Sequence, residues 1–188
     1  MRSALAARLF DLAACLPLGI LHHLGAMLGW LTYALSGTYA RRMRENLASA
    51  MADSPEPEIR RILHASIAEA GKGVAELPWL WRRPLGEVTT SIRVCHGWEH
   101  VEAAQAQGRG VIFLTPHLGC FEISATYAAQ RLPLTVLYRP PKMAWLEPLM
   151  RSGRKHGSAS LARTDLGGVR LLIKALRRGE AVGLLPDQ

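Results

Sequence analysis

The chain has 188 residues, enough for one domain with a real hydrophobic core. Its three cysteines are an odd number and form no CxxC pair, which argues against a disulfide framework or a zinc knuckle and favours a reducing compartment. The net charge is +8, and residues 111–188 carry eleven basic against five acidic side chains. This excess lies within apparently folded sequence, so it indicates a partner with phosphate or other acidic groups.

The first predicted element is an apolar segment near the N-terminus. Residues 12–40 contain no Asp, Glu, Lys or Arg, and such a length is sufficient for a helix that crosses a bilayer. Pro17 and several glycines interrupt the segment, and His22 and His23 lie within it. A monotopic or re-entrant hairpin therefore competes with a spanning helix, and a pair of buried core helices also fits this composition.

The basic cluster R-R-M-R follows the apolar segment directly, from Arg41 to Arg44. Positive charge on this flank predicts that the rest of the chain stays on the cytoplasmic side of the membrane. We therefore expect two parts, a membrane anchor or hairpin over residues 1–40 and a folded domain over residues 41–188.

Helical and strand patterns alternate after the anchor, which predicts an α/β fold with a layered central sheet flanked by helices. Pro78 and Pro84, with Trp79 and Trp81 between them, indicate a loop or interfacial corner. The predicted strands are 89–95, 111–115, 134–138, 158–162 and 181–185. The predicted helices are 41–51, 59–71, 98–107, a segment that ends near 131, 144–156 and 168–178.

The segment V-I-F-L-T-P-H-L-G-C-F-E, residues 111–122, carries the strongest chemical signal. Pro116 cannot donate to a sheet ladder, so the strand should end there. Positions five apart lie about 140° from each other on a helix, so His117 should lie in the turn and Glu122 in the first turns of the next helix. A carboxylate can then reach the imidazole, as in an oriented general base. Alternatively, His117 caps the helix and Glu122 only favours its dipole.

Three blocks of this sequence resemble, in content and order, the bacterial lipid A biosynthesis acyltransferases. These are late lauroyl and myristoyl transferases within the lysophospholipid and glycerolphosphate acyltransferase group, whose hallmark is H-x-x-x-x-D/E. The blocks are T-P-H-L-G-C-F-E, L-Y-R-P-P-K and G-V-R-L-L-I-K-A-L-R-R-G-E-A-V-G-L-L-P-D-Q. A single HxxxxE motif is weak evidence, but the three blocks together are specific. The resemblance implies a glycerolphosphate-acyltransferase-like fold, with the catalytic part on the cytoplasmic face of the bacterial inner membrane.

The resemblance also implies a catalytic pair. His117 would take the proton from the acceptor hydroxyl as that hydroxyl attacks an acyl thioester, and Glu122 would hold the imidazole tautomer. Arginine suits a phosphate or a developing oxyanion. The implied substrate-binding residues are Arg139, Lys142, Arg154 and Asp187. Each of these four also has a plain structural interpretation, as a solvated surface charge or a turn residue.

The implied co-substrate is an acyl carrier protein thioester, and the implied acceptor is a phosphorylated glycolipid, a lipid A precursor. No metal or other cofactor is implied. One alternative is acylation of another lipid acceptor, a lysophospholipid or a lipoamino acid. Another is a non-catalytic lipid-binding remnant, because family members continue beyond the L-P-D-Q block and we expect this chain to be incomplete at its C-terminus. Nucleic-acid binding is not expected, since the positive charge is interleaved with apolar sequence. A G-x-S-x-G elbow is absent, which argues against a serine hydrolase.

Overall fold

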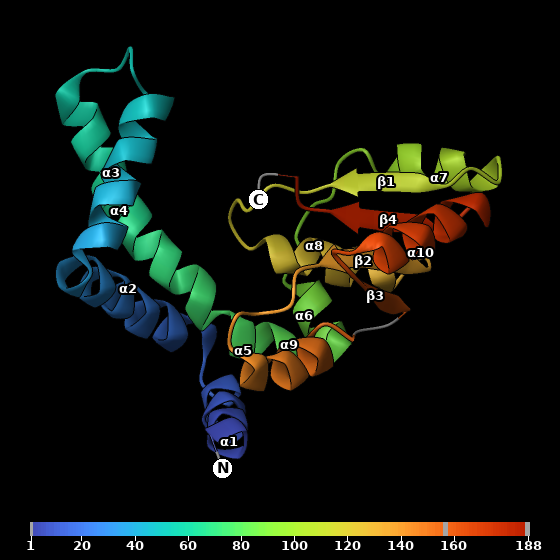
Figure 1. Cartoon of the computed structure of the whole chain (residues 1–188), viewed down its shortest axis with the longest axis horizontal. Coiled ribbons are helices and arrows are strands. Elements are labelled where there is room, and N and C mark those ends of the chain that lie inside the picture. The colour runs from blue at the N-terminus through green and yellow to red at the C-terminus, as the bar shows by residue number, and fades with distance from the viewer. Residues whose placement is uncertain (1, 156–157, 187–188) are drawn as a thin grey trace. The chain divides into compact units, whose positions relative to one another are not determined.

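The computed structural model of the chain describes residues 2–155 and 158–186 (Figure 1). The chain forms two compact units. One runs from Leu12 to Trp79, and the other combines Met1–Asp11 with Leu80–Gln188. The boundary that we expected at residue 40, between an anchor and a catalytic domain, stays a prediction.

The N-terminal apolar segment is divided into two helices, α1 (Arg2–Ala14) and α2 (Leu18–Leu35). Pro17 separates them, because its ring fixes the backbone dihedral φ and its nitrogen has no hydrogen to donate. Among the described residues, α2 alone is long and apolar enough to cross a membrane. Only 17% of that stretch is buried, so α2 differs from the core helix of a soluble protein.

Three helices form most of the unit Leu12–Trp79. They are α2, α3 (Gly37–Ala50) and α4 (Glu56–Ala75). The Ser36 hydroxyl caps α3 by accepting a hydrogen bond from the Tyr39 N–H. Helix α4 begins three residues before the predicted start, because Pro57 is tolerated in the first turn, where its missing N–H has no helical partner to lose.

Helices α2 and α4 pack with their backbones in direct contact. A Cβ atom added to Gly71 would lie 2.0 Å from the Gly25 carbonyl oxygen, and one added to Gly29 would lie 2.3 Å from the Ile67 carbonyl oxygen. Only glycine permits such an approach without a shift of the backbone. Near the end of α4, His22 Nε2 lies 2.7 Å from Oε1 of Glu76. Gly25 and Gly29, two of the glycines that interrupt the apolar segment, therefore serve its packing.

The second unit contains a parallel sheet of four strands in the order β1-β4-β2-β3, which confirms the predicted α/β fold. Alternating strand and helix segments produce this topology, since parallel neighbours need a crossover connection. All four of these strands were predicted to within one residue at each end. They are β1 (Val111–Leu114), β2 (Leu134–Tyr138), β3 (Ala159–Arg163) and β4 (Ala181–Leu184).

The sheet has two hydrophobic faces, because successive residues of a strand point to opposite sides. Ala181 belongs to a core cluster with Ala128 and Ala129 of α8, whereas Val182 belongs to a second cluster with Leu172 and Ala175. Helices α8 and α10 therefore cover opposite faces of the sheet. The bounds of the helices around it are α7 (Trp98–Ala106), α8 (Phe121–Ala129) and α10 (Leu166–Arg177).

The predicted strand at 89–95 is wrong. The chain instead forms a short helix, α6 (Leu85–Thr90), followed by irregular backbone. Thr89 and Thr90 return hydrogen bonds from their hydroxyls to the carbonyls of Leu85 and Glu87, and Val88 is fully buried. Tertiary packing thus overrides the β preference of the Val and Thr residues.

Two further segments differ from the prediction, one because it is helical and the other because its helix is shorter. The segment that we interpreted as a loop is α5 (Leu77–Arg82), which buries Leu80 and Trp81 and places Pro78 in its first turn. The helix predicted at 144–156 is shorter. It consists of the 3-10 turn η1 (Ala144–Leu146) and α9 (Glu147–Gly153).

Replacing Gly71 with alanine should destabilise the helical unit, because the new methyl group would meet the backbone of α2. We expect the free energy of unfolding to fall by about 1–3 kcal/mol, as for other overpacked sites. Gly73→Ala is the matched control, since a Cβ atom added there would meet no other part of the structure within 4 Å outside the backbone of its own helix. That variant should gain up to about 1 kcal/mol from helix propensity. Urea unfolding in detergent micelles, followed by circular dichroism, measures both, and equal midpoints would contradict the packing.

Candidate functional site

The candidate site begins where β1 ends. The Thr115 N–H still donates to the Leu184 carbonyl at 2.9 Å, and Pro116 then ends the ladder. Residues 115–120 form an irregular turn, in which Gly119 has a φ of +58° that suits glycine. His117 lies in this turn, and its ring packs against Phe121 with 4.6 Å between the ring centroids. The motif thus lies at the carboxyl end of a parallel strand, where site residues of open α/β sheets collect.

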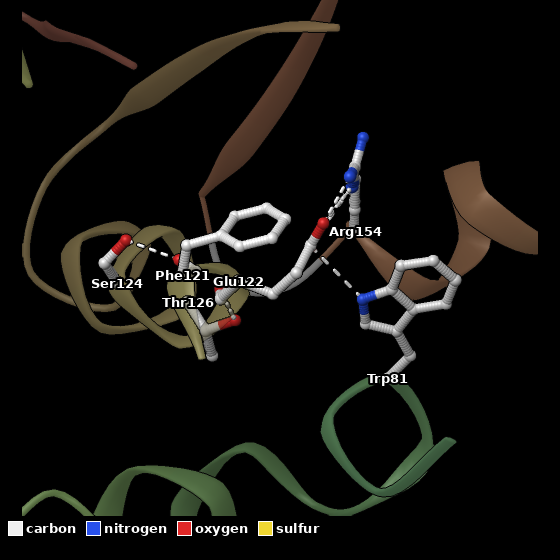
Figure 2. Close-up of polar contacts among 6 residues, drawn as sticks. All are labelled: Trp81, Phe121, Glu122, Ser124, Thr126 and Arg154. Carbon is white, nitrogen blue, oxygen red and sulfur yellow. Dashed lines mark hydrogen bonds and ion pairs between the residues drawn. The ribbon is translucent and has the colours of Figure 1, made fainter. Parts of the chain in front are cut away.

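Glu122 lies in the first turn of α8 and is buried, with 9% of its surface exposed. Its carboxylate accepts hydrogen bonds from Nε of Arg154 at 3.0 Å and 3.1 Å, one to each oxygen. Nη2 of Arg154 also donates to Oε1, and Nε1 of Trp81 donates to Oε2 at 3.3 Å. Figure 2 shows that the guanidinium and the indole approach the carboxylate from two different segments. The carboxylate is therefore held at both oxygens.

Two short helices position these partners. Arg154 follows Gly153 at the end of α9, and Trp81 comes from α5. Gly153 allows the two elements to approach, because a Cβ atom there would lie 2.4 Å from the Trp81 ring. Phe10 of α1 packs against the same indole, with ring centroids 5.5 Å apart. Arg154 and Trp81 thus occupy defined places before any ligand binds.

The charge of Glu122 is compensated within the protein. A buried carboxylate is costly unless it is paired and hydrogen-bonded, and here one guanidinium and one indole donor meet both of its oxygens. Arginine matches this geometry because its N–H groups form a planar fork. The arrangement can hold a carboxylate rigidly beside the turn that contains His117.

An apolar cavity of about 400 Å³ borders this cluster. It lies between the sheet and helices α7 and α8, and Trp81, Glu122 and Arg154 line part of its wall. Hydrophobic side chains dominate the rest, which suits a hydrocarbon better than a polar ligand. Examples from the two helices and the sheet are Trp98, Val101, Phe113, Ala125, Leu134 and Val136.

The structure brings some of the predicted site residues together. His117 lies in the turn and Glu122 at the start of the helix, as their spacing indicated, and Arg154 contacts Glu122 directly. A hydrogen bond between His117 and Glu122 stays a prediction. Arg139 and Lys142 are exposed in the segment after β2 and are not part of the buried cluster. The predicted site residue Asp187 lies outside the described residues.

The sequence reasoning missed Trp81 as a partner of Glu122. The two residues are 41 positions apart, and no motif connects them. The one available signal was the pair Trp79 and Trp81 beside Arg82 and Arg83, which indicated a loop or interfacial corner, or ordinary core contacts, rather than a hydrogen bond to Glu122.

A second polar cluster positions the helix that carries Arg154. Glu147, at the start of α9, accepts a hydrogen bond from the Tyr138 hydroxyl at 3.1 Å and pairs with Arg163. It therefore ties α9 to the carboxyl ends of β2 and β3. The hydrogen bond from Arg163 lowers the pKa of Glu147, partial burial opposes this, and the hydrogen bond from Tyr138 lowers it further.

Replacement of Glu147 with glutamine should change the pH dependence of stability. A carboxyl group whose pKa falls on folding adds stability above its ordinary pKa, and loses it as the pH falls through the folded value. At neutral pH the wild type should therefore unfold at higher urea than Glu147→Gln. The difference between the two midpoints should shrink as the pH falls below 4.5, the ordinary value for glutamate. A difference that stays constant down to strong acid would contradict the role of Glu147.

Removal of Arg154 should destabilise the fold strongly, because it leaves Glu122 buried without its cation. We expect Arg154→Ala to lose about 3 kcal/mol of unfolding free energy. Arg151→Ala is the control from the same helix, since its guanidinium is half exposed and lies 3.9 Å from Glu147 in a surface pair. That variant should lose less than about 1 kcal/mol. Equal losses in urea unfolding would mean that the Glu122 contact contributes no more than a surface pair.

Comparison with known proteins identifies the family. Over 92% of the chain, the sequence is 30% identical to the lipid A biosynthesis lauroyltransferase of Escherichia coli K12 and 26% identical to the palmitoleoyltransferase of the same strain. A lipid A biosynthesis acyltransferase of Shigella flexneri is also 26% identical over 92% of the chain. The aligned part covers 55–56% of these relatives, so the chain spans about half their length. The sequence profile of one family matches residues 3–188, and the chain therefore belongs to the bacterial lipid A biosynthesis acyltransferases.

Proposed function

We propose that the chain transfers a fatty acyl group from an acyl carrier protein thioester to a hydroxyl of a phosphorylated glycolipid, a lipid A precursor. The observation that carries this proposal is the buried cluster of Glu122, Arg154 and Trp81, which lies beside the His117 turn and borders an apolar cavity. Family membership supports both the reaction class and the lipid acceptor.

In this mechanism His117 acts as the general base. It takes the proton from the acceptor hydroxyl as the oxygen attacks the thioester carbonyl. The new carbon–oxygen bond forms, the carbon–sulfur bond breaks, and the proton passes to the departing thiolate. The turn after β1 suits this task because it exposes the imidazole at the carboxyl edge of the sheet.

Glu122 is the positioning partner of His117 in the proposal. A carboxylate that accepts the N–H of one ring nitrogen selects the tautomer in which the other nitrogen is free to take a proton. Arg154 and Trp81 support this role, because they hold both carboxylate oxygens and restrict the rotamer of Glu122. A base is most effective when its orientation is fixed before the substrate arrives.

The apolar cavity supports an acyl chain as the transferred group. Each methylene that leaves water contributes about 0.8 kcal/mol, so a long chain binds such a cavity without polar contacts. The polar part of the wall, at Glu122 and Arg154, would lie toward the thioester. Relatives named for lauroyl and palmitoleoyl transfer are consistent with a fatty acyl substrate.

The acceptor and donor are proposed from charge. Arg139 and Lys142 are exposed after β2 and suit the phosphates of a glycolipid, and Asp187 is retained as a candidate contact. The donor protein is proposed to be acidic, because the chain has a net charge of +8.

Membrane association is suggested by family membership and by the apolar helix α2. We place the catalytic part on the cytoplasmic face of the inner membrane, because the basic residues after the apolar segment match the positive-inside pattern.

An acyl-transfer assay tests the proposal. Membranes with the wild-type protein or a variant receive a lauroyl carrier-protein thioester and, in parallel reactions, a tetra-acylated lipid A precursor or a lysophospholipid. His117→Ala should lower the rate by about 10²–10⁴-fold, the usual contribution of a general base, and Glu122→Gln should also lower it. His100→Ala is the control, since this exposed histidine lies on α7. Equal rates in all four proteins would contradict the catalytic roles, and transfer only to a lysophospholipid would contradict the acceptor.

A further inference from the structure

Four large apolar side chains are exposed in the loop-and-helix connections that follow the strands, with Trp145 in η1 and Leu166 as the first residue of α10. The exposed fraction is 80% for Leu118 after β1 and 78% for Leu166 after β3. Met143 and Trp145, after β2, are 53% and 38% exposed. We call these four residues the edge patch. Single exposed apolar residues are common, but several large ones from separate loops at one edge indicate a binding surface.

The sheet topology brings these loops to one edge, because the strands are parallel and their carboxyl ends point the same way (Figure 1). Three contacts hold the loops near the strand ends. The Thr115 N–H donates to the carbonyl of Leu184, and the Thr164 N–H donates to that of Tyr138. Glu147, two residues after Trp145, accepts a hydrogen bond from the Tyr138 hydroxyl.

Two cations are exposed at this edge. Arg139 and Lys142 are both exposed in the loop that contains Met143 and Trp145. The described carboxylates nearby already have partners within the protein. Glu122 is bound by Arg154, Glu147 by Arg163, and Asp165 accepts from the Gly168 N–H at 2.8 Å.

We propose that the edge patch docks onto an anionic lipid surface. The four apolar side chains would enter the boundary between headgroups and acyl chains, and Arg139 and Lys142 would meet the lipid phosphates. This combination of apolar side chains with flanking cations favours a lipid surface over an acidic protein, because the apolar groups come from the connections after three different strands rather than from one groove. The proposal goes beyond acyl transfer and does not depend on it.

Site-specific fluorescence on the full chain tests the docking surface. In a background with Cys15, Cys95 and Cys120 replaced by serine, single cysteines at Leu118, Met143 and Leu166 carry an environment-sensitive nitrobenzoxadiazole label. The matched controls are Leu171 and Ile173, which are 51% and 45% exposed and lie more than one turn beyond Leu166 along α10, away from the strand end. The vesicles contain phosphatidylcholine with phosphatidylglycerol, and a second set carries doxyl-labelled acyl chains. Neither acyl donor nor acceptor is present.

The edge labels should shift to shorter emission wavelengths with vesicles and lose emission to the doxyl lipids, whereas the control labels should change little. Arg139→Gln combined with Lys142→Gln should weaken the response on anionic vesicles and leave that on pure phosphatidylcholine nearly unchanged. Equal responses at edge and control positions would overturn the proposal. A response to an acidic carrier protein but not to vesicles would also overturn it, as would edge labels already shielded before vesicles are added.

Discussion

The pairing of Glu122 with Arg154 is the interaction on which the candidate site depends. It joins the start of α8 to the end of α9, two elements that follow different strands, and the Trp81 N–H adds a third element, α5. A buried carboxylate needs such partners, so the same contacts that satisfy its charge also fix its position. Gly153 makes this convergence possible, because any larger residue would collide with the Trp81 ring.

Sequence patterns predicted the parts of the fold that depend on local information. Strands β1, β2 and β4 are short, largely apolar runs bounded by turn residues, and the turn with His117 follows from Pro116. Segment 89–95 could not be predicted in this way. Val88 is buried and Pro84 starts helix α6, and these two features override the β-branched composition of the segment. Contact between Trp81 and Glu122 is a property of the assembled fold, since 41 residues separate them.

The carboxyl edge of the sheet combines three features that the proposed reaction requires. The buried Glu122 cluster lies beside the His117 turn, the apolar cavity extends from that cluster between the sheet and α8, and the exposed cations Arg139 and Lys142 follow β2. In the proposed function, the cavity would hold the acyl chain and the exposed cations would meet a phosphorylated lipid. Membership in the lipid A biosynthesis acyltransferase family agrees with both kinds of ligand.

In the proposed mechanism Glu122, held by Arg154, orients the imidazole of His117. Nitrogen NMR of ¹⁵N-labelled histidine measures this directly, because the two ring nitrogens of a neutral imidazole have different shifts in each tautomer. We predict one dominant tautomer at His117 in the wild type and a mixture of both in Glu122→Gln and in Arg154→Ala. If the ring-nitrogen shifts of His117 are the same in all three folded proteins, Glu122 does not orient the imidazole.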